Sequence, residues 1–384
     1  MKRSIAATAA IAALALTLSA CGNDAVPSDP TTSSGATEPV DTASETEDNT
    51  DGDATLSGTI KGAGASSQEK GQNAWAAEFS IATGVDVAYN PVGSGDGRKS
   101  FLEGAVVYAG SDSAMKEEEI AEAETRCYGS EVIEVPLWIS PIAVVYNIPA
   151  LNDTNINLSP VQIADIFSGK ITNWNDESIV AANPDIELPD LAIVPVNRTD
   201  QSGTTKNFQQ YLIDAAGEAW PHEAEEVWPI EGTQSGQGTS GLLEVVSGAE
   251  GTIGYVDASR VGDLGSIAVG VGDEYVPFSS EAAAKIVDIS SPTADATDLR
   301  LTIDLARDTT ESGVYPVVLV SYLIACSAYD NEQDAANVQA YLKYVASEEG
   351  QNLAAQAEVG GIAPISADLR TKVNAALDQI TVAN

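Results

Sequence analysis

Imidazole is almost absent from this chain, whose 384 residues include a single histidine, His222. A metal site built from several histidines is therefore impossible, and a Ser-His-Asp triad has one candidate base. Basic residues are also scarce, with 18 Lys+Arg against 57 Asp+Glu and a formal net charge of -39. This balance excludes a nucleic-acid partner, because phosphate backbones are bound by basic surfaces. No metal and no other cofactor is expected.

The hydrophobic run at the N-terminus is too short to be a good membrane span. Two positive charges, Lys2 and Arg3, precede the run, and Leu18-Ser19-Ala20-Cys21 ends it. This pattern indicates a secretory signal over residues 1–20. The ending resembles the lipobox of bacterial lipoproteins, in which Cys21 is acylated, with palmitate among its lipids, and becomes the first mature residue. An ordinary signal peptide with an accidental cysteine is the alternative.

The segment that follows the signal is rich in Ser, Thr, Pro and Gly. From Gly22 to Thr55 it holds nine acidic residues and no basic one. Such a composition cannot bury enough apolar surface to order itself. We therefore interpret residues 21–55 as an acidic disordered tether between the lipid and a folded domain.

Cysteine is rare as well, with three residues in all. If Cys21 carries lipid, Cys127 and Cys326 remain, and an exported location permits them to form a disulfide. Two buried free thiols are the alternative.

Beyond the tether, strand and helix patterns alternate, and four strand-to-helix junctions carry Gly and hydroxyl residues. In a doubly wound α/β sheet such junctions share the carboxyl edge of the strands, where ligands bind. The expected strands, each with the junction that follows it, are Ser57–Ile60 before Gly62–Ser67, Val85–Tyr89 before Gly93–Gly97, Val106–Ala109 before Gly110–Asp112, and Ile193–Asn197 before Arg198–Thr205.

Two long apolar segments, Val132–Tyr146 and Tyr315–Cys326, are natural places for the chain to cross between lobes. The expected fold is α/β, with two doubly wound lobes joined by two hinge strands and the ligand in the cleft between them. Residues 56–140 and 316–384 would form the first lobe and residues 141–315 the second.

Several short motifs occur in an order that resembles one family. They are Gly62-Ala63-Gly64-Ala65-Ser66, Gly93-Ser94-Gly95, Gly110-Ser111-Asp112, Gly169-Lys170-Ile171 with Trp174, Arg198-x-Asp200-x-Ser202-Gly203-Thr204 and Gly254-Tyr255-Val256. Together they resemble the PstS family, the phosphate-binding proteins of bacterial phosphate ABC importers, from about Leu56 to the C-terminus.

The resemblance implies a type II periplasmic-binding-protein fold and a role in transport rather than catalysis. The protein would capture inorganic phosphate outside the cell and deliver it to an ABC permease driven by a cytoplasmic ATPase. It would be a monomer, held by its lipid at the outer face of the cytoplasmic membrane.

The resemblance also implies which residues hold the anion. Ser66, Ser67, Ser94 and Asp112 come from the first lobe, and Arg198, Ser202, Gly203 and Thr204 from the second. Asp200 matches a residue that pairs with the arginine. The chain departs from the family at Ser67, where a bulky residue is common; a contact through the backbone N–H of Ser67 survives that change, whereas a wall made by a ring does not.

Asp112 is the informative residue in this set. An ionised carboxylate only accepts hydrogen bonds, so it repels an anion unless the anion donates a proton. Phosphate keeps a proton at neutral pH and sulfate does not, so Asp112 is expected to select against sulfate. A helix N-cap ahead of Ala114–Glu117 is the alternative reading of Asp112.

Gly236-Gln237-Gly238-Thr239-Ser240-Gly241 matches the dinucleotide fingerprint G-x-G-x-x-G, but it lies late in an exported chain rather than in a first βαβ unit. We expect a loop that borders the anion cleft. Two other functions remain open: a receptor for another oxyanion or an adhesion or signalling lipoprotein, and an exported phosphate-ester hydrolase. The missing His/Asp metal cluster disfavours the hydrolase, and Asp112 disfavours other oxyanions.

Overall fold

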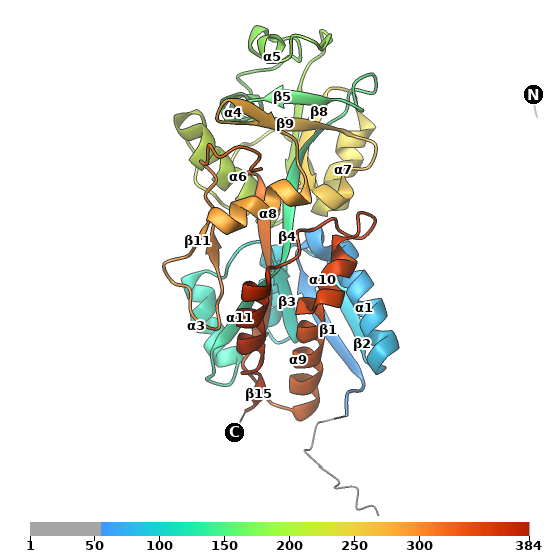
Figure 1. Ribbon diagram of the computed structural model, residues 1–384, viewed down its shortest axis with the longest axis vertical. Helices are drawn as coiled ribbons and strands as arrows, with labels where there is room; N and C mark the ends of the chain where they lie inside the picture. The colour runs from blue at the N-terminus through green and yellow to red at the C-terminus, as the bar shows by residue number, and fades with distance from the viewer. Residues whose placement is uncertain (1–54, 384) are drawn as a thin grey trace, which may run out of the picture. The chain divides into compact units, whose positions relative to one another are not determined.

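A computed structural model describes residues 55–383. The predicted signal, Cys21 and almost all of the predicted tether lie outside these residues. Two lobes follow from the strand pairing (Figure 1). The first lobe holds the strands β1 (Thr59–Gly64), β2 (Asp86–Asn90), β3 (Tyr108–Ser111), the start of β4 (Val132–Tyr146) and β13 (Val318–Cys326).

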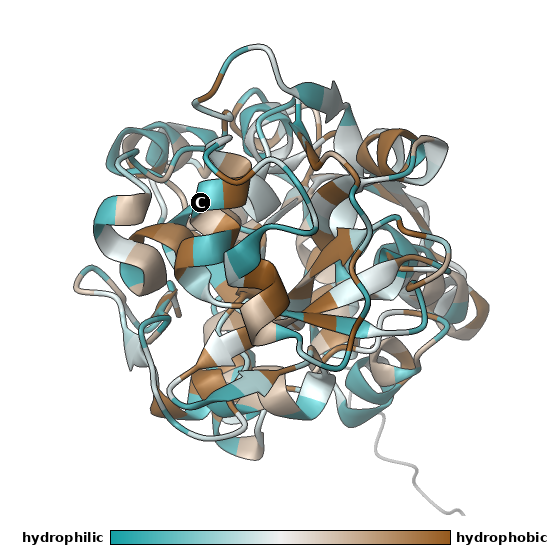
Figure 2. Cartoon of the chain, turned by 90° about the horizontal axis from the view of Figure 1, so that it is seen from above, coloured by the Kyte–Doolittle hydropathy of each residue, from teal (hydrophilic) through white to brown (hydrophobic). Residues whose placement is uncertain are grey.

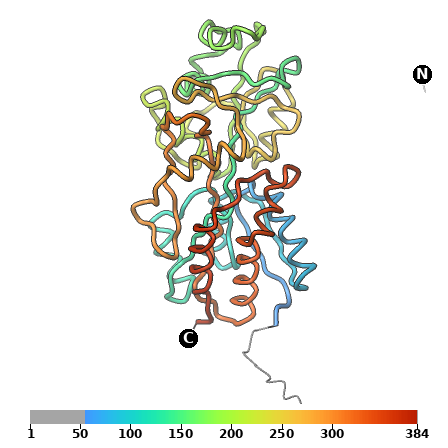
Figure 3. Tube along the Cα trace, viewed as in Figure 1, coloured from blue at the N-terminus to red at the C-terminus, as the bar shows by residue number. Residues whose placement is uncertain are grey.

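The helices of the first lobe come from both ends of the described chain. They are η1 (Ser66–Gln68), α1 (Glu69–Thr83), α2 (Ser94–Leu102), α3 (Glu117–Arg126), α9 (Glu332–Ala346), α10 (Glu348–Ala355) and α11 (Ala367–Leu377), with the short strands β14 (Ala328–Tyr329) and β15 (Thr381–Val382). Helix α1 contacts α10, and α9 contacts β1, so N-terminal and C-terminal segments lie side by side (Figure 3).

The second lobe is built on the end of β4. Its strands are β5 (Asn155–Leu158), β6 (Val194–Arg198), β7 (Gln234–Gly236), β8 (Thr252–Asp257), β9 (Gly265–Val271) and β10 (Glu274–Val276). Its helices are α4 (Pro160–Phe167), α5 (Glu177–Ala182), α6 (Gly203–Ala216), η2 (Gly217–Ala219), α7 (Gly238–Gly248) and η3 (Ala258–Arg260); α8 (Ser280–Ile289) lies against β4.

The two lobes share a single sheet because β4 runs through both. Its first half pairs antiparallel with β13, from Val132 opposite Cys326 to Pro141 opposite Val318, and its second half pairs with β8 and β9. All fifteen residues of β4 are buried, which explains its nearly continuous apolar sequence. The predicted crossing at Val132–Tyr146 is confirmed as one long strand.

The segment between α8 and β13 departs from the predicted lobe limits. Strands β11 (Ser291–Pro292) and β12 (Ile303–Asp304) form a small antiparallel pair. Arg300 bridges to Glu134 at the start of β4, and the N–H of Ile303 donates to the Tyr322 hydroxyl of β13. Part of the segment predicted to belong to the second lobe therefore contacts the first.

The parallel pairing of β1 with β2 and β3 brings the predicted junctions to one edge. Gly64 lies opposite Gly110, and Ala63 opposite Asn90. The second lobe repeats this arrangement, since β6 pairs parallel with β7 and β8. As expected for a doubly wound sheet, the turns that carry Ser and Asp residues end up together.

Large aromatic side chains fill the core behind these turns. In the first lobe the Trp138 ring meets Trp75 edge-on, with 5.7 Å between centroids. In the second, Phe208 stacks on Tyr255 at 4.5 Å, and Phe167 packs edge-on against Phe208 at 4.9 Å. Hydrophobic residues concentrate on the central strands and hydrophilic ones on the peripheral loops (Figure 2). The core thus anchors β6 and α6, whose adjoining ends carry the second lobe's predicted residues.

Candidate functional site

Asp112 is the meeting point of the predicted residues of the first lobe. It follows β3 and is only 3% exposed. The Ser67 hydroxyl donates to Oδ1 of Asp112 at 2.7 Å, and the Asp112 N–H donates to the Ser94 hydroxyl at 3.1 Å. The turns that follow three parallel strands therefore converge on Asp112, where Ser67 bonds the carboxylate and Ser94 bonds the backbone N–H.

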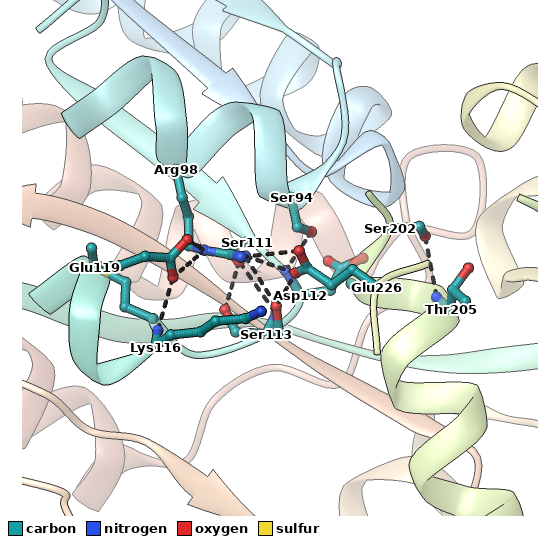
Figure 4. Close-up of polar contacts among 12 residues, drawn as sticks. Ser94, Arg98, Ser111, Asp112, Ser113, Lys116, Glu119, Ser202, Thr205 and Glu226 are labelled. Atoms are coloured by element: carbon teal, nitrogen blue, oxygen red, sulfur yellow. Dashed lines mark hydrogen bonds and ion pairs between the residues drawn. The ribbon is translucent and has the colours of Figure 1, made fainter. Parts of the chain in front are cut away.

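The start of α6 reaches the same carboxylate from the second lobe. Ser202 caps the helix, accepting from the N–H of Thr205 at 3.1 Å, and the Thr204 hydroxyl donates to Oδ2 of Asp112 at 2.8 Å (Figure 4 shows Ser202, Thr205 and Asp112). Gly203 is required by this approach, since a Cβ there would lie 2.6 Å from the Ser94 hydroxyl oxygen. The lobes thus touch where the sequence predicted an anion.

Arg198 supplies the positive charge at the end of β6 and is 4% exposed. Its Nε donates to Oδ1 of Asp200 at 2.8 Å, and its Nη2 bonds Oδ2 of Asp200. The N–H of Gly238 also donates to Asp200, at 2.8 Å. Burial by itself raises the pKa of Asp200, but the Arg198 hydrogen bonds and charge and the Gly238 N–H outweigh it and hold that pKa below its ordinary value. Asp200 therefore fixes one edge of the guanidinium and leaves the Nη1 edge free to point elsewhere.

The charge on Asp112 is set by opposing effects. Burial raises its pKa, while hydrogen bonds from Ser67, Ser321 and Thr204 and the charge of Arg198 lower it, and the net direction is upward. A carboxylate offers about four lone-pair positions. Two hydroxyls occupy Oδ1 and one occupies Oδ2. One acceptor position on Oδ2 is left for a donor.

Comparison with known proteins identifies the family. A family model described as a PBP superfamily domain matches residues 49–349. Phosphate-binding protein PstS 3 of Mycobacterium tuberculosis is 31% identical over 382 residues, which cover 98% of each chain. This chain belongs to the PstS family. Phosphate-binding protein PstS of Haemophilus influenzae is 28% identical over 81% of this chain and 90% of its own.

Solved structures show the fold of the family. A periplasmic phosphate-binding protein with bound phosphate aligns with a TM-score of 0.66 at 19% identity, over 83% of this chain and 93% of that one. The phosphate-binding protein from Stenotrophomonas maltophilia aligns with a TM-score of 0.62 at 20% identity, again over 83% and 93%. The predicted type II periplasmic-binding-protein fold is confirmed.

The structure decides two alternatives that the sequence left open. Cys127 and Cys326 form a disulfide between the end of α3 and the end of β13, so the prediction of paired cysteines is confirmed. The N-cap reading of Asp112 is wrong, because α3 begins at Glu117 and its N-cap is Lys116. The chain between the end of β3 at Ser111 and the start of α3 at Glu117 is not helical, so the Asp112 side chain can face the second lobe.

Three further side chains contact the predicted set, and sequence reasoning did not name them as site residues. The Ser321 hydroxyl of β13 donates to Oδ1 of Asp112 at 2.7 Å. Asn207, one turn after Gly203, donates to the Asp112 carbonyl at 2.6 Å. The Thr239 hydroxyl lies 3.0 Å from that of Ser66. Of these three, only Thr239 was indicated by the sequence, because its Gly-rich loop was expected to border the anion cleft.

Residues 55–383 contain neither a metal-binding cluster nor a membrane-spanning helix. No group of three or more His, Cys, Asp and Glu side chains in that range is arranged to hold a metal ion. No helix within it is both long enough and apolar enough to cross a membrane.

Proposed function

We propose that this protein is an extracytoplasmic substrate-binding protein that captures inorganic phosphate and delivers it to an ABC import permease. The observation that carries the proposal is Asp112, which takes donors from both lobes and keeps one acceptor position on Oδ2. A phosphate that still has a proton donates to that position, whereas fully ionised sulfate has no proton to offer. Selection by a mismatched acceptor pair follows from this chemistry.

The remaining phosphate oxygens need donors from several directions. We assign these to Ser66, Ser67, Ser94, Ser202, Gly203, Thr204 and the free edge of Arg198. The first N–H groups of a helix have no intrahelical acceptor. Because Ser202 already accepts from Thr205 through its side chain and from Lys206 through its carbonyl, the N–H groups of Gly203 and Thr204 are suited to an anion.

The cellular setting is part of the same proposal. Residues 1–20 are removed, lipid on Cys21 anchors the chain at the outer face of the cytoplasmic membrane, and a monomer meets the permease, which a cytoplasmic ATPase drives. The two lobes move relative to each other. One consists of residues 56–140 and 316–384, and the other of residues 141–315, of which residues 291–304 also contact the first lobe. Two of its relatives, from Mycobacterium tuberculosis and Haemophilus influenzae, are named phosphate-binding proteins, which supports a transport role.

Equilibrium dialysis with labelled phosphate tests the proposal. The protein is expected to retain phosphate, to release it to unlabelled phosphate, and to keep it in excess sulfate or phosphate ester. Absence of retained phosphate would refute the function. Equal competition by sulfate would instead leave an oxyanion receptor without the selectivity that we assign to Asp112.

A further inference from the structure

A buried arginine joins the two lobes close to the anion site. Arg98 of α2 is 2% exposed, and its Nε donates to both carboxylate oxygens of Glu119, at 3.0 and 2.9 Å. Its Nη1 and Nη2 donate to the two oxygens of Glu226 at 2.9 and 3.0 Å (Figure 4). Glu119 lies on α3 of the first lobe, whereas Glu226 lies between η2 and β7 of the second. Of the two ion pairs that Arg98 makes, the one with Glu226 crosses between the lobes.

The same arginine holds the residues on either side of Asp112. Its Nη1 donates to the hydroxyls of Ser111 at 2.8 Å and Ser113 at 3.0 Å. The Ser113 hydroxyl in turn donates to Oε1 of Glu226 at 2.6 Å. Because Ser111 and Ser113 flank Asp112 in the chain, the position of the Asp112 backbone depends on this cluster.

The backbone around Glu226 is attached to the other half of the site. Its carbonyl accepts from the N–H of Ser202 at 3.0 Å, and Ser202 caps α6. The Gln209 amide of α6 donates to the Glu225 carbonyl at 2.7 Å. Glu226 thus connects the start of α6 through its main chain with the Asp112 turn through its side chain.

The lobes meet closely at this point. The N–H of Gly95 donates to the carbonyl of Gln201 at 3.2 Å. A Cβ on Gly95 would lie 2.3 Å from Oε1 of Gln201 and 2.9 Å from Oε2 of Glu226. The contact leaves no room for a side chain at Gly95, so the two lobes touch through main chain here.

Glu226 keeps its charge in this buried place. Burial by itself raises its pKa, but the hydrogen bonds and charge of Arg98 and the Ser113 hydroxyl outweigh burial and hold that pKa below its ordinary value. A buried two-bond ion pair is screened little by salt. When the lobes separate, Arg98 retains Glu119, and Glu226 must find water instead.

We propose that Glu226 is a positioning residue that couples closure of the lobes to the geometry of the anion site. Glu226 holds Asp112 and the start of α6 together, although it is not one of the residues that we assign to phosphate binding. The inference rests on the proposed function, since it concerns how long the closed cleft retains phosphate.

Stopped-flow measurement of phosphate binding and release tests this role with the variant Glu226→Gln. We expect the dissociation rate to rise between about tenfold and several hundred-fold, because loss of one partner of a buried charge pair acts mainly on dissociation. The association rate should change by less than about threefold, since the pair forms only as the lobes close. Glu119→Gln is the matched control, because it removes the same charge from the same arginine within one lobe, and it should change both rates by less than about threefold.

The outcomes separate the two proposals. Wild-type protein that binds no phosphate refutes the proposed function and this inference with it. If wild-type protein binds phosphate, equal effects of Glu226→Gln and Glu119→Gln overturn only the positioning role, as does an unchanged dissociation rate. Circular dichroism confirms folding, and if Glu226→Gln does not fold, Glu226→Asp decides instead: its shorter side chain keeps the charge but loses the two-bond reach, and unaltered release by that variant refutes the role.

Discussion

Replacement of Asp112 by Asn is the sharpest test of anion selection. In the structure Oδ1 accepts from Ser67 and Ser321, and Oδ2 accepts from Thr204. An Asn side chain keeps these bonds best if its oxygen takes the Oδ1 position, because two hydroxyl donors meet there. Its NH₂ group then occupies the Oδ2 position, where a donor faces the anion in place of an acceptor.

The effect on selectivity combines two contributions. Phosphate loses a hydrogen bond to a charged group, which is worth about 1.5–3 kcal/mol. Sulfate no longer leaves a buried acceptor unsatisfied, a relief of about 1–3 kcal/mol. Their sum is about 2.5 kcal/mol at the lower end, and at about 1.4 kcal/mol per factor of ten the phosphate-to-sulfate ratio should fall by about 60-fold or more. Phosphate affinity itself should fall less than the ratio does, since the new amide donates to an unprotonated oxygen.

Isothermal titration calorimetry with phosphate and with sulfate measures both constants for wild type and variant. Thr204→Val is the matched control, because it removes a partner of Asp112 but keeps the carboxylate, and it should weaken phosphate binding while preserving preference for phosphate over sulfate. A ratio of constants unchanged by Asp112→Asn would show that the carboxylate does not select the anion.

Three further predictions concern charge, cross-linking and pH. Arg198→Lys should weaken phosphate binding by about 30-fold or more, because an ammonium is a point charge that cannot reproduce the planar guanidinium fork, which bonds Asp200 along one edge and is assigned to phosphate along the other. An affinity measured by calorimetry within about threefold of wild type would contradict the assigned site. Replacement of Cys127 and Cys326 by Ser should lower the free energy of unfolding by about 2–5 kcal/mol, and coincident urea curves for this variant and the oxidised wild type would refute that. Burial raises the pKa of Asp257 to about 6 from its ordinary 3.8, so the folded state keeps a proton that the unfolded state releases. Stability should therefore fall by up to about 3 kcal/mol as pH rises from about 4 to about 6. Asp257→Asn should remove this part of the pH dependence in urea unfolding, and identical slopes for the two proteins would exclude it.

Local chemistry made much of the fold readable from the sequence. Ser159 and Gln162 form a capping box at the start of α4, a motif that can be read from the sequence because its partners are three residues apart. The Gly and Ser turns after β1, β2 and β3 were recognisable because parallel strands bring such junctions to one edge whatever the rest of the chain does. The Arg198–Asp200 pair is equally local, at a separation of two residues.

Composition alone likewise excluded two kinds of site. A single histidine excludes a metal site built from several histidines, and the small number of basic residues argues against a nucleic-acid partner. The pairing of Cys127 with Cys326 needed one more fact, the exported location, and even then free thiols stayed possible. Element limits were less certain, as at β1, expected at Ser57–Ile60 and found at Thr59–Gly64. Apolar patterns mark the middle of a strand better than its ends.

The tertiary structure alone decided which side chains complete the site. Ser321 lies in an apolar strand 209 positions from Asp112, and Glu226 lies in a loop 128 positions from Arg98. Neither shows a pattern in its own segment, because a hydrogen bond between residues far apart in the chain depends on where the strands and loops that carry them lie in space. The contacts of residues 291–304 with the first lobe have the same origin. Local propensity specifies the helices and strands of this protein. The hydrogen-bond partners of its buried polar side chains are set instead by which groups lie close together in the folded chain, because a buried polar group must be paired.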